Sequence, residues 1–467
     1  MAVLFNSYVF CLVFLPLALL GWWWLPGTRL RLGFLTLASY LFYGWWDWRF
    51  IPLMLLSTSA DYFAGGYLAR NERAGRRRAC LILLLAFNLG ILGIFKYFDF
   101  FTGTLNGLGA LLGVPVDLPL LHLVLPVGIS FYTFNSISYT IDIYRGRLAP
   151  ARGFLEFAAF VSMFPHLIAG PIVRYADMAP QLERVPPRLE TAAWVTGIWF
   201  LVLGLAKKVL VADALAEQIV TPLWHQWASL DSGEAWLATL GYTLQIYFDF
   251  SGYSDMAVGL AFLLGFRFPQ NFNSPYRAAS IAEFWRRWHM SLSYWIRDYL
   301  YVPLGGSERG AARAVRNLLV VMFLGGLWHG AAWTFVVWGL YHGLLLGAHA
   351  WCRRHGLVPH IAPLGALLTF VLVMLGWVLF RSTSIAEAGH LLSVMTGVIS
   401  GAGGNGGLMG AFAYPLLLAS LGIVWFSPNS WELRFPRSRF AAVGLAILTL
   451  ACVLRFATPS PFLYFQF

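Results

Sequence analysis

Two histidines carry the chemistry that this sequence suggests. His329 lies in GGLWHGAAWTFVVWGLYHG, inside a long apolar run, and Trp328 directly precedes it. Ionisable groups at membrane depth are costly to bury, so they usually face a bundle interior or a watery cavity and mark a functional site. On one continuous helix, His329 and Trp333 would line one wall, because residues four apart share a face. His342, thirteen residues after His329, would then face elsewhere.

His289 is the second histidine, in EFWRRWHMSLSYWIRDYLY, close to Trp285 and Arg286. Two histidines on separate elements can meet in one cavity, where one takes a proton from an attacking hydroxyl while the other orients a group or stabilises an oxyanion. Burial favours the neutral imidazole that a general base needs. The alternative is that His289 hydrogen-bonds a helix end near lipid headgroups.

Carboxylates also occur inside an apolar segment. Asp249 and Asp255 flank Tyr253 in YFDFSGYSDMAVG, and Asn273 follows in the turn NFNSPYR. The two carboxylates could form an acid–base pair or a cation site, or they could fix helices by pairing with Arg or by capping backbone donors. We favour the structural role. The sequence shows no nucleophile elbow, P-loop or H-E-x-x-H motif, and it predicts no metal.

The elements that must position these residues are membrane helices. The chain has 467 residues, of which 59% are hydrophobic and 11% charged, with a mean hydropathy of +0.67. Soluble domains carry about 25% charged residues, and the deficit here is spread along the whole length. We therefore predict an all-α polytopic membrane protein with about 11–14 helices. The four cysteines are too far apart to indicate a disulfide framework or a zinc site.

Apolar stretches long enough to approach a membrane span predict where these helices lie. They are residues 8–25, 31–48, 51–68, 79–98, 120–143, 153–173, 193–212, 235–265, 317–336, 337–351, 362–380, 407–426 and 439–457. We expect residues 153–173, which contain Pro165 and Pro171, to form a re-entrant or kinked element. Residues 282–304 are amphipathic and predict an interfacial helix.

Basic residues between the spans predict the orientation and contact with anionic lipid, and they make nucleic-acid binding improbable despite a net charge of +11. The five arginines between residues 70 and 78 indicate the cytoplasmic side, which puts the N-terminus in the periplasm. Residues 213–234 carry acidic and no basic side chains, so they should face outward. We expect the apolar first twenty-five residues to form a retained membrane helix.

The segment WRRWHMSLSYWIRDYLYVPLGG, followed about forty residues after its histidine by GGLWHGAAWTFVVWGLYHG, resembles the membrane-bound O-acyltransferase family. LPVGISFYTFNSISYTIDIYRG, FPHLIAGPIVRY and YFDFSGYSDMAVGLAFLLGFRFPQNFNSPY are similar to its bacterial, alginate O-acetyltransferase-like branch. The resemblance covers residues 1–350 of one transmembrane domain, 1–467, and residues 351–467 add C-terminal helices that are less diagnostic.

The resemblance implies a ring of helices around a central funnel, with re-entrant and interfacial helices. His329 corresponds to the family's essential histidine and His289 to its second polar position. The donor would be acetyl-CoA or another acyl thioester from the cytoplasm, used as a substrate, with no bound cofactor. The partners would be periplasmic acetyltransferase or polymer-modification proteins and membrane lipid. Candidate substrate-binding residues are Trp328, Trp333, Trp285, Arg286, Asn273, Tyr253 and Asp249.

The function that follows is transfer of acetyl across the bacterial inner membrane for O-acetylation of an exported polysaccharide, alginate- or cellulose-like. One alternative is D-alanyl or other acyl transfer to a cell-envelope polymer. A second is a channel for an acyl group or lipid without bond chemistry, with Asp249 and Asp255 marking the pathway. A third is a scaffold for polymer-secretion enzymes, in which neither histidine matters.

Overall fold

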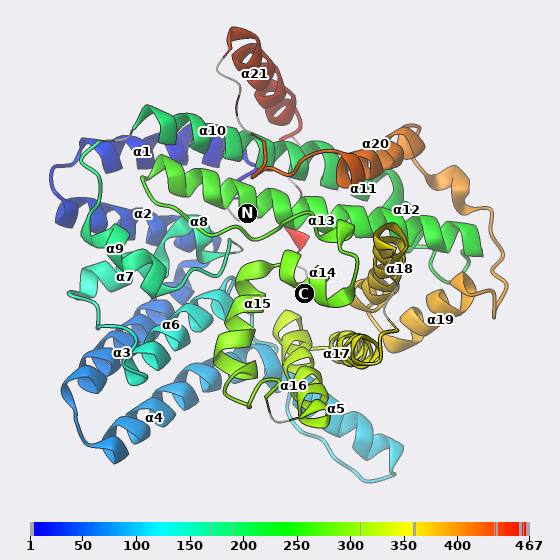
Figure 1. The fold of residues 1–467 in the computed structure, drawn as a ribbon, viewed down its shortest axis with the longest axis horizontal. Coiled ribbons are helices and arrows are strands. Elements are labelled where there is room, and N and C mark those ends of the chain that lie inside the picture. Colours follow the sequence, from blue (N-terminus) through cyan, green and yellow to red (C-terminus); the bar gives the residue numbers. More distant parts are fainter. Residues whose placement is uncertain are drawn as a thin grey trace. The chain divides into compact units, whose positions relative to one another are not determined.

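The computed structural model describes residues 4–168, 170–188, 190–308, 310–357, 361–433, 435, 438–456, 460 and 462–463. Throughout these ranges the chain forms helices, turns and irregular segments and no strand (Figure 1). The predicted all-α fold is confirmed. Apolar side chains dominate both the buried and the exposed helix surfaces, as expected for helices that face lipid on one side and protein on the other.

The chain forms two compact units. The first contains Met1–Gly197 and Ala257–Phe268, and the second contains Ile198–Met256 and Pro269–Phe467. Helices α10 (Thr191–Leu205) and α13 (Ser232–Leu263) each run from one unit into the other. Both histidines singled out by the sequence belong to the second unit.

The first unit is built from helices that follow one another along the chain. Its helices are α1 (Leu15–Trp24), α2 (Thr28–Asp47), α3 (Ile51–Arg70), α4 (Ala74–Leu92), α5 (Phe98–Leu111), α6 (Ile129–Tyr144), α7 (Phe154–Ser162), α8 (Phe164–Leu167) and α9 (Tyr175–Glu183). α3 packs against α6, and α2 packs against α7. The predicted kink within 153–173 is confirmed, because α7 and α8 are separated at Met163 and Pro165 occupies the first turn of α8, where proline is tolerated. The predicted span 120–143 is helical only from Ile129.

The second unit holds the remaining helices. They are α11 (Asp213–Leu215), α12 (Thr221–Trp224), α14 (Ile281–Arg287), α15 (Met290–Ile296), α16 (Ala311–His329), α17 (Trp333–Arg354), α18 (Ala362–Arg381), α19 (Ile385–Met395), α20 (Ala413–Phe426) and α21 (Arg439–Leu454).

Short π-helical segments occur in both units, at Phe10–Phe14, Gly93–Tyr97, Ala206–Ala212, Ala216–Val220 and Arg297–Tyr301. The 3₁₀ turns are at Trp48–Phe50, Pro275–Arg277 and Asn405–Leu408.

The closest helix pair is α16 and α17, which lie side by side (Figure 1). Glycines make this approach possible: a Cβ on Gly339 would collide with the Met322 carbonyl, and one on Gly326 would collide with the Phe335 carbonyl. Small residues at helix interfaces are how membrane helices bring their backbones together. This helix pair positions His329, which lies at the end of α16.

Five helical stretches among the described residues are long and apolar enough to cross a membrane. They are Ala74–Leu111, Thr191–Trp224, Ala311–His329, Trp333–Arg354 and Ala362–Arg381. Shorter apolar helices occur at Phe10–Trp24, Ile385–Met395, Ala413–Phe426 and Arg439–Leu454. The protein is therefore a multi-pass membrane protein.

Two predicted boundaries in the second unit are wrong. The sequence predicted one span over 317–336 and a second over 337–351, but the helices are separated at residues 330–332, where Gly330 is extended and no hydrogen-bonded turn continues. The predicted interfacial helix 282–304 is also divided, since α14 ends at Arg287 and α15 begins at Met290. Each break is next to one of the two histidines.

Candidate active site

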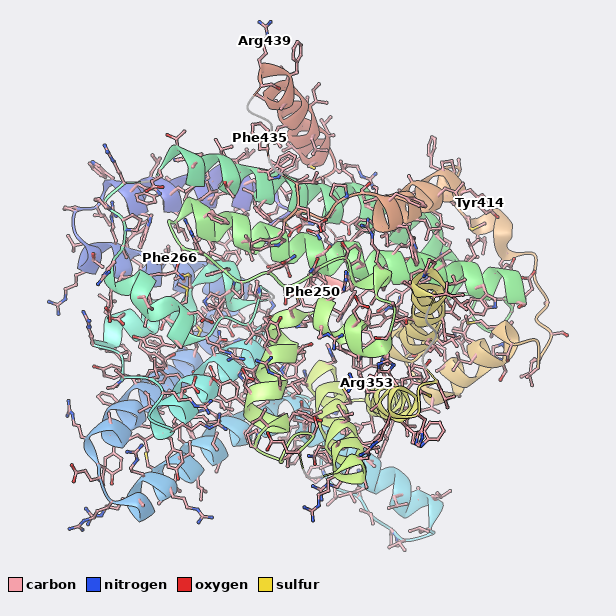
Figure 2. All side chains as sticks on the ribbon, viewed as in Figure 1. Phe250, Phe266, Arg353, Tyr414, Phe435 and Arg439 are labelled. Atoms are coloured by element: carbon pink, nitrogen blue, oxygen red, sulfur yellow. The ribbon has the colours of Figure 1, made fainter. Side chains whose placement is uncertain are left out.

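His289 occupies a strained point of the backbone. It lies between α14 and α15 with φ 42° and ψ 54°, in the left-handed region. Few non-glycine residues adopt this conformation, and those that do are found disproportionately at functional sites. The side chain is 1% exposed. Its ring packs edge-on against Phe250 of α13, labelled in Figure 2, with centroids 4.7 Å apart.

Asn271 fixes which nitrogen of His289 carries the proton. The Asn271 Oδ1 accepts hydrogen bonds from the backbone N–H of Ser291 at 3.2 Å and from its hydroxyl at 2.9 Å. A backbone N–H can only donate, so this Asn271 atom is the amide oxygen. His289 Nδ1 lies 3.1 Å from the same oxygen and must therefore donate its proton to it. In a neutral imidazole the other nitrogen, Nε2, then carries a free lone pair.

The surroundings of His289 keep Nε2 unprotonated, so that its lone pair can accept a hydrogen bond. Burial lowers the pKa of His289 to about 3, because the low-dielectric interior disfavours the imidazolium ion. The ring is thus neutral at physiological pH. Nε2 is buried and has no hydrogen-bond partner among the described residues. A buried acceptor without a donor is costly, and a substrate hydroxyl would satisfy it.

His329 is the last residue of α16 and is 5% exposed. The aromatic rings around its imidazole include Trp328 and Trp338, each with its centroid 5.0 Å away, and Phe380 of α18 at 5.2 Å. Trp328 also packs against His289, with centroids 5.9 Å apart. One indole therefore touches both histidines. The structure brings together the pair that the sequence singled out, in a water-poor aromatic environment.

The prediction that Trp333 lines one wall with His329 assumed one continuous helix. That assumption was wrong, because His329 ends α16 and Trp333 begins α17, where it is 51% exposed. Gly330 makes the sharp turn possible, since a Cβ there would collide with the Phe335 ring. Trp338, further along α17, packs edge-on against the His329 ring.

His342, for which the sequence predicted a different direction, shares one aromatic neighbour with His329. Its ring lies 4.9 Å from that of Trp338, which also contacts His329. Trp285 contacts both Trp338 at 5.7 Å and His342 at 5.2 Å. Trp285 and His342 thus belong to the same aromatic cluster as His329.

The remaining predicted substrate-binding residues lie in different surroundings. Arg286 is exposed on α14. The Asn273 side-chain oxygen accepts a hydrogen bond from Asn429 at 3.1 Å. Tyr253 is buried, and its ring lies 4.7 Å from that of Phe462.

Asp249 and Asp255 each pair with a lysine. Lys208 lies 2.6 Å from Asp249 and 2.8 Å from Asp213, and Lys207 lies 2.6 Å from Asp255. Pairing of this kind agrees with the structural role favoured from the sequence, although that expectation named Arg and the partners are Lys. Two adjacent lysines thus tie the π-helical segment Ala206–Ala212 to α13.

Four residues of the site were missed by reasoning from the sequence: Asn271, Phe250, Trp338 and Phe380. Asn271 stands two positions before Asn273 in the same turn, so a search of that turn for imidazole partners would have found it. Phe250 and Phe380 come from distant parts of the chain and resemble any other apolar residue in a span. No local pattern distinguishes them.

Comparison with known proteins identifies the class. Residues 151–366 match the model of MBOAT, the membrane-bound O-acyltransferase family. A protein of Pseudomonas putida named "Probable alginate O-acetylase" is 39% identical over the full length of both chains. The chain belongs to the membrane-bound O-acyltransferase family. A protein of the same name from Azotobacter vinelandii is 45% identical over 84% of this chain and 78% of its own length. A peptidoglycan O-acetyltransferase of Helicobacter pylori is 37% identical over 85% of this chain and 80% of its own.

Membership of the membrane-bound O-acyltransferases confirms the resemblance seen in the sequence and makes this protein an O-acyltransferase. The matched region, residues 151–366, contains His289, Asn271, His329 and Trp338. Phe380 lies beyond it, on α18, and so belongs to the C-terminal part that the sequence motifs described least well.

Proposed function

We propose that this membrane-bound O-acyltransferase moves acetyl from a cytosolic thioester, acetyl-CoA or a similar donor, across the bacterial inner membrane for O-acetylation of an exported polysaccharide. The polymer is alginate- or cellulose-like. The observation that carries the proposal is the buried, unpartnered Nε2 of His289, joined to His329 through Trp328. Such an acceptor suits a hydroxyl substrate. The names of the relatives, which include alginate O-acetylase and peptidoglycan O-acetyltransferase, support acetyl as the transferred group.

The two histidines would divide the work of the transfer. A neighbouring hydroxyl of the acceptor donates a hydrogen bond to His289 Nε2, which orients the attacking hydroxyl toward the acyl carbon. His329 takes the proton of the attacking hydroxyl as the C–O bond forms, and the C–S bond of the thioester breaks. His329 then returns the proton to the departing sulfur, so the products are an ester and a free thiol. A variant of this route, in which His329 briefly carries the acetyl group, balances in the same way.

Access and partners complete the proposal. The donor enters from the cytoplasm, and the N-terminus and residues 213–234 face the periplasm, as the charge pattern predicts. Trp328, Trp285 and Trp338 line the reaction space. Periplasmic acetyltransferase or polymer-modification proteins receive or complete the transfer.

The test uses the full-length protein in lipid nanodiscs with radiolabelled acetyl-CoA and a polysaccharide acceptor. We expect His329→Ala to abolish acetyl-ester formation and His289→Gln to reduce it strongly. The control is His355→Gln, because His355 is exposed and its ring packs at a tilt against that of Trp351, with centroids 4.7 Å apart. Full transfer by a folded His329→Ala protein would refute the proposal.

The same assay separates the alternatives. A channel would pass the acyl group without consuming thioester, and a scaffold would be indifferent to both histidines. A D-alanyl transferase would prefer a D-alanyl thioester over acetyl-CoA. Measuring thioester loss and ester formation with both donors therefore assigns the protein to one of these classes.

A further inference from the structure

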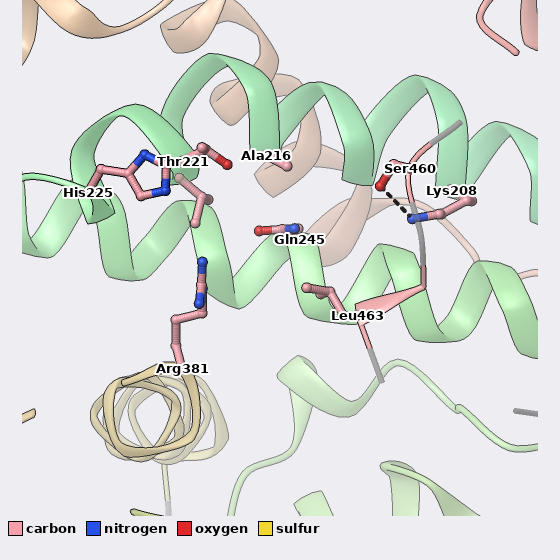
Figure 3. A pocket seen from close by; sticks show the side chains of 9 residues that line it. Lys208, Ala216, Thr221, His225, Gln245, Arg381, Ser460 and Leu463 are labelled. Carbon is pink, nitrogen blue, oxygen red and sulfur yellow. Dashed lines mark hydrogen bonds between the residues drawn. The ribbon is translucent and has the colours of Figure 1, made fainter. Parts of the chain in front are cut away.

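The second unit contains a cavity of about 270 Å³ that the proposed reaction does not use. Its polar lining comes from the π-helical region, α12, α13, α18 and the C-terminal segment, namely Lys208, Thr221, His225, Gln245, Arg381 and Ser460 (Figure 3). A liquid water occupies about 30 Å³, so the cavity has room for a group the size of a single sugar ring. Two candidate spans end at this place, at Trp224 and at Arg381.

The two cations of the cavity, Lys208 and Arg381, differ in whether carboxylates neutralise their charge. Lys208 is matched by two carboxylates, those of Asp249 and Asp213. Arg381 lies over the rings of Trp224 and Tyr242, 5.6 and 5.8 Å from their centroids, and it forms no ion pair with a carboxylate among the described residues. A guanidinium fixed by aromatic faces keeps its edge donors free for a planar anion. Among the residues that the structure describes, the Arg381 end of the cavity therefore carries a positive charge that no carboxylate neutralises.

Gln245 adds a second requirement for a ligand of this cavity, namely a hydrogen-bond donor. It is 8% exposed, and its Oε1 has no hydrogen-bond partner among the described residues. Figure 3 shows its side chain extending into the cavity between Arg381 and Thr221 on one side and Lys208 on the other. An orphaned buried acceptor calls for a donor. A ligand that satisfies both needs carries a carboxylate for Arg381 and a hydroxyl for Gln245.

We propose that this cavity binds a uronic-acid unit of the acceptor polysaccharide, with Arg381 pairing its carboxylate and Gln245 accepting a hydrogen bond from a ring hydroxyl. The inference rests on the proposed function and narrows it, because it selects an acidic, alginate-like polymer over a neutral, cellulose-like one. Arg381 and Gln245 would be specificity-determining residues.

The position of the cavity relative to the histidines supports this role. Arg381 directly follows Phe380, whose ring packs on that of His329 at 5.2 Å. Gln245 lies on α13 little more than one turn before Phe250, whose ring packs on that of His289 at 4.7 Å. Two of the helices that line the cavity, α13 and α18, thus also carry residues that pack on the two histidines.

Binding is measured with the full-length protein in nanodiscs by titration calorimetry, without any acetyl donor. The probes are glucuronate, glucose, acetate and inorganic phosphate. We expect glucuronate to bind more tightly than glucose by roughly ten- to a hundredfold, the range for hydrogen bonds to a charged group, and more tightly than acetate or phosphate. Arg381→Gln should remove that preference. Arg439→Gln, which alters an arginine stacked on Phe440 at 5.5 Å, should leave it unchanged.

A second variant guards against a folding defect. Gln245→Glu places a carboxylate in the cavity as an internal partner for Arg381, so the protein should fold and lose glucuronate binding. Equal affinity for glucuronate and glucose, or an Arg381→Gln protein with unchanged affinity, would overturn the inference. Equally tight binding of acetate or phosphate would overturn the sugar-acid assignment. Arg381-dependent glucuronate binding in a protein that transfers no acetyl would instead overturn the proposed function and leave the sugar-acid site standing.

Discussion

Asn271→Asp is the substitution that tests the tautomer argument most directly. It keeps the oxygen that accepts the His289 proton and nearly the same volume, but it adds a negative charge beside the imidazole. Wild-type His289 is neutral down to a pKa of about 3 because it is buried. A carboxylate partner favours the imidazolium ion instead.

The size of the effect follows from the distance of 3.1 Å between the Asn271 oxygen and His289 Nδ1. At an effective dielectric constant near 20, two opposite unit charges at this separation attract by about 5 kcal/mol. Since about 1.4 kcal/mol corresponds to one pH unit, this is enough to raise the pKa of His289 from about 3 to near neutrality. A substantial fraction of the protein would then carry a protonated Nε2, which donates and cannot accept from the substrate hydroxyl.

The assay is the pH dependence of kcat/KM for acetyl transfer in nanodiscs. The wild type should show no loss attributable to His289 between pH 8 and about pH 5, because its pKa lies far below. The variant should lose activity as the pH falls through neutrality and recover it as the pH rises. Ser254→Ala is the uncharged control, since it removes only the hydroxyl that Asn271 Nδ2 contacts at 3.1 Å. A wild-type pH profile in the aspartate variant would refute the reasoning.

Two further predictions concern packing and charge. Gly339→Ala should lower the thermal unfolding midpoint in detergent, because its Cβ meets the Met322 carbonyl and overpacking costs about 1–3 kcal/mol. The control Gly422→Ala should leave the midpoint unchanged, because its Cβ meets no atom within 4 Å. Equal midpoints for the two variants would contradict the packing argument. Lys208→Met should destabilise the protein by about 3–5 kcal/mol by leaving Asp249 buried without its partner. The double variant with Asp249→Leu should recover much of the loss in the same unfolding assay, and failure to recover would show that the pair is not the cause.

The sequence predicted the helices well because burial in lipid requires long apolar runs, which composition reveals directly. The breaks at residues 288–289 and 330–332 were missed for a physical reason. Neither contains proline, and Gly330 sits in an apolar context in which a helix would also be allowed. Tertiary packing of Phe335 against Gly330 decides the matter, and local patterns do not contain that information.

The candidate site was predicted in part. His289 and His329 were found because ionisable residues stand out in an apolar sequence. The residues that position the two histidines were not found, since Asn271 acts through one side-chain oxygen and Phe380 through its shape. The partners of Asp249 and Asp255 were also out of reach, because Lys208 and Lys207 lie far away along the chain and only the folded structure brings them together.

The left-handed backbone at His289 has a consequence for how this residue can be replaced. Glycine adopts that conformation at no steric cost, so His289→Gly removes the imidazole while relieving the backbone on which it is mounted. What is left between Phe250 and Trp328 is a vacancy with the outline of the lost ring. The imidazole of His289 can therefore be removed without straining the backbone. Free imidazole supplied in solution is the natural molecule to refill the space and chemically rescue the enzyme.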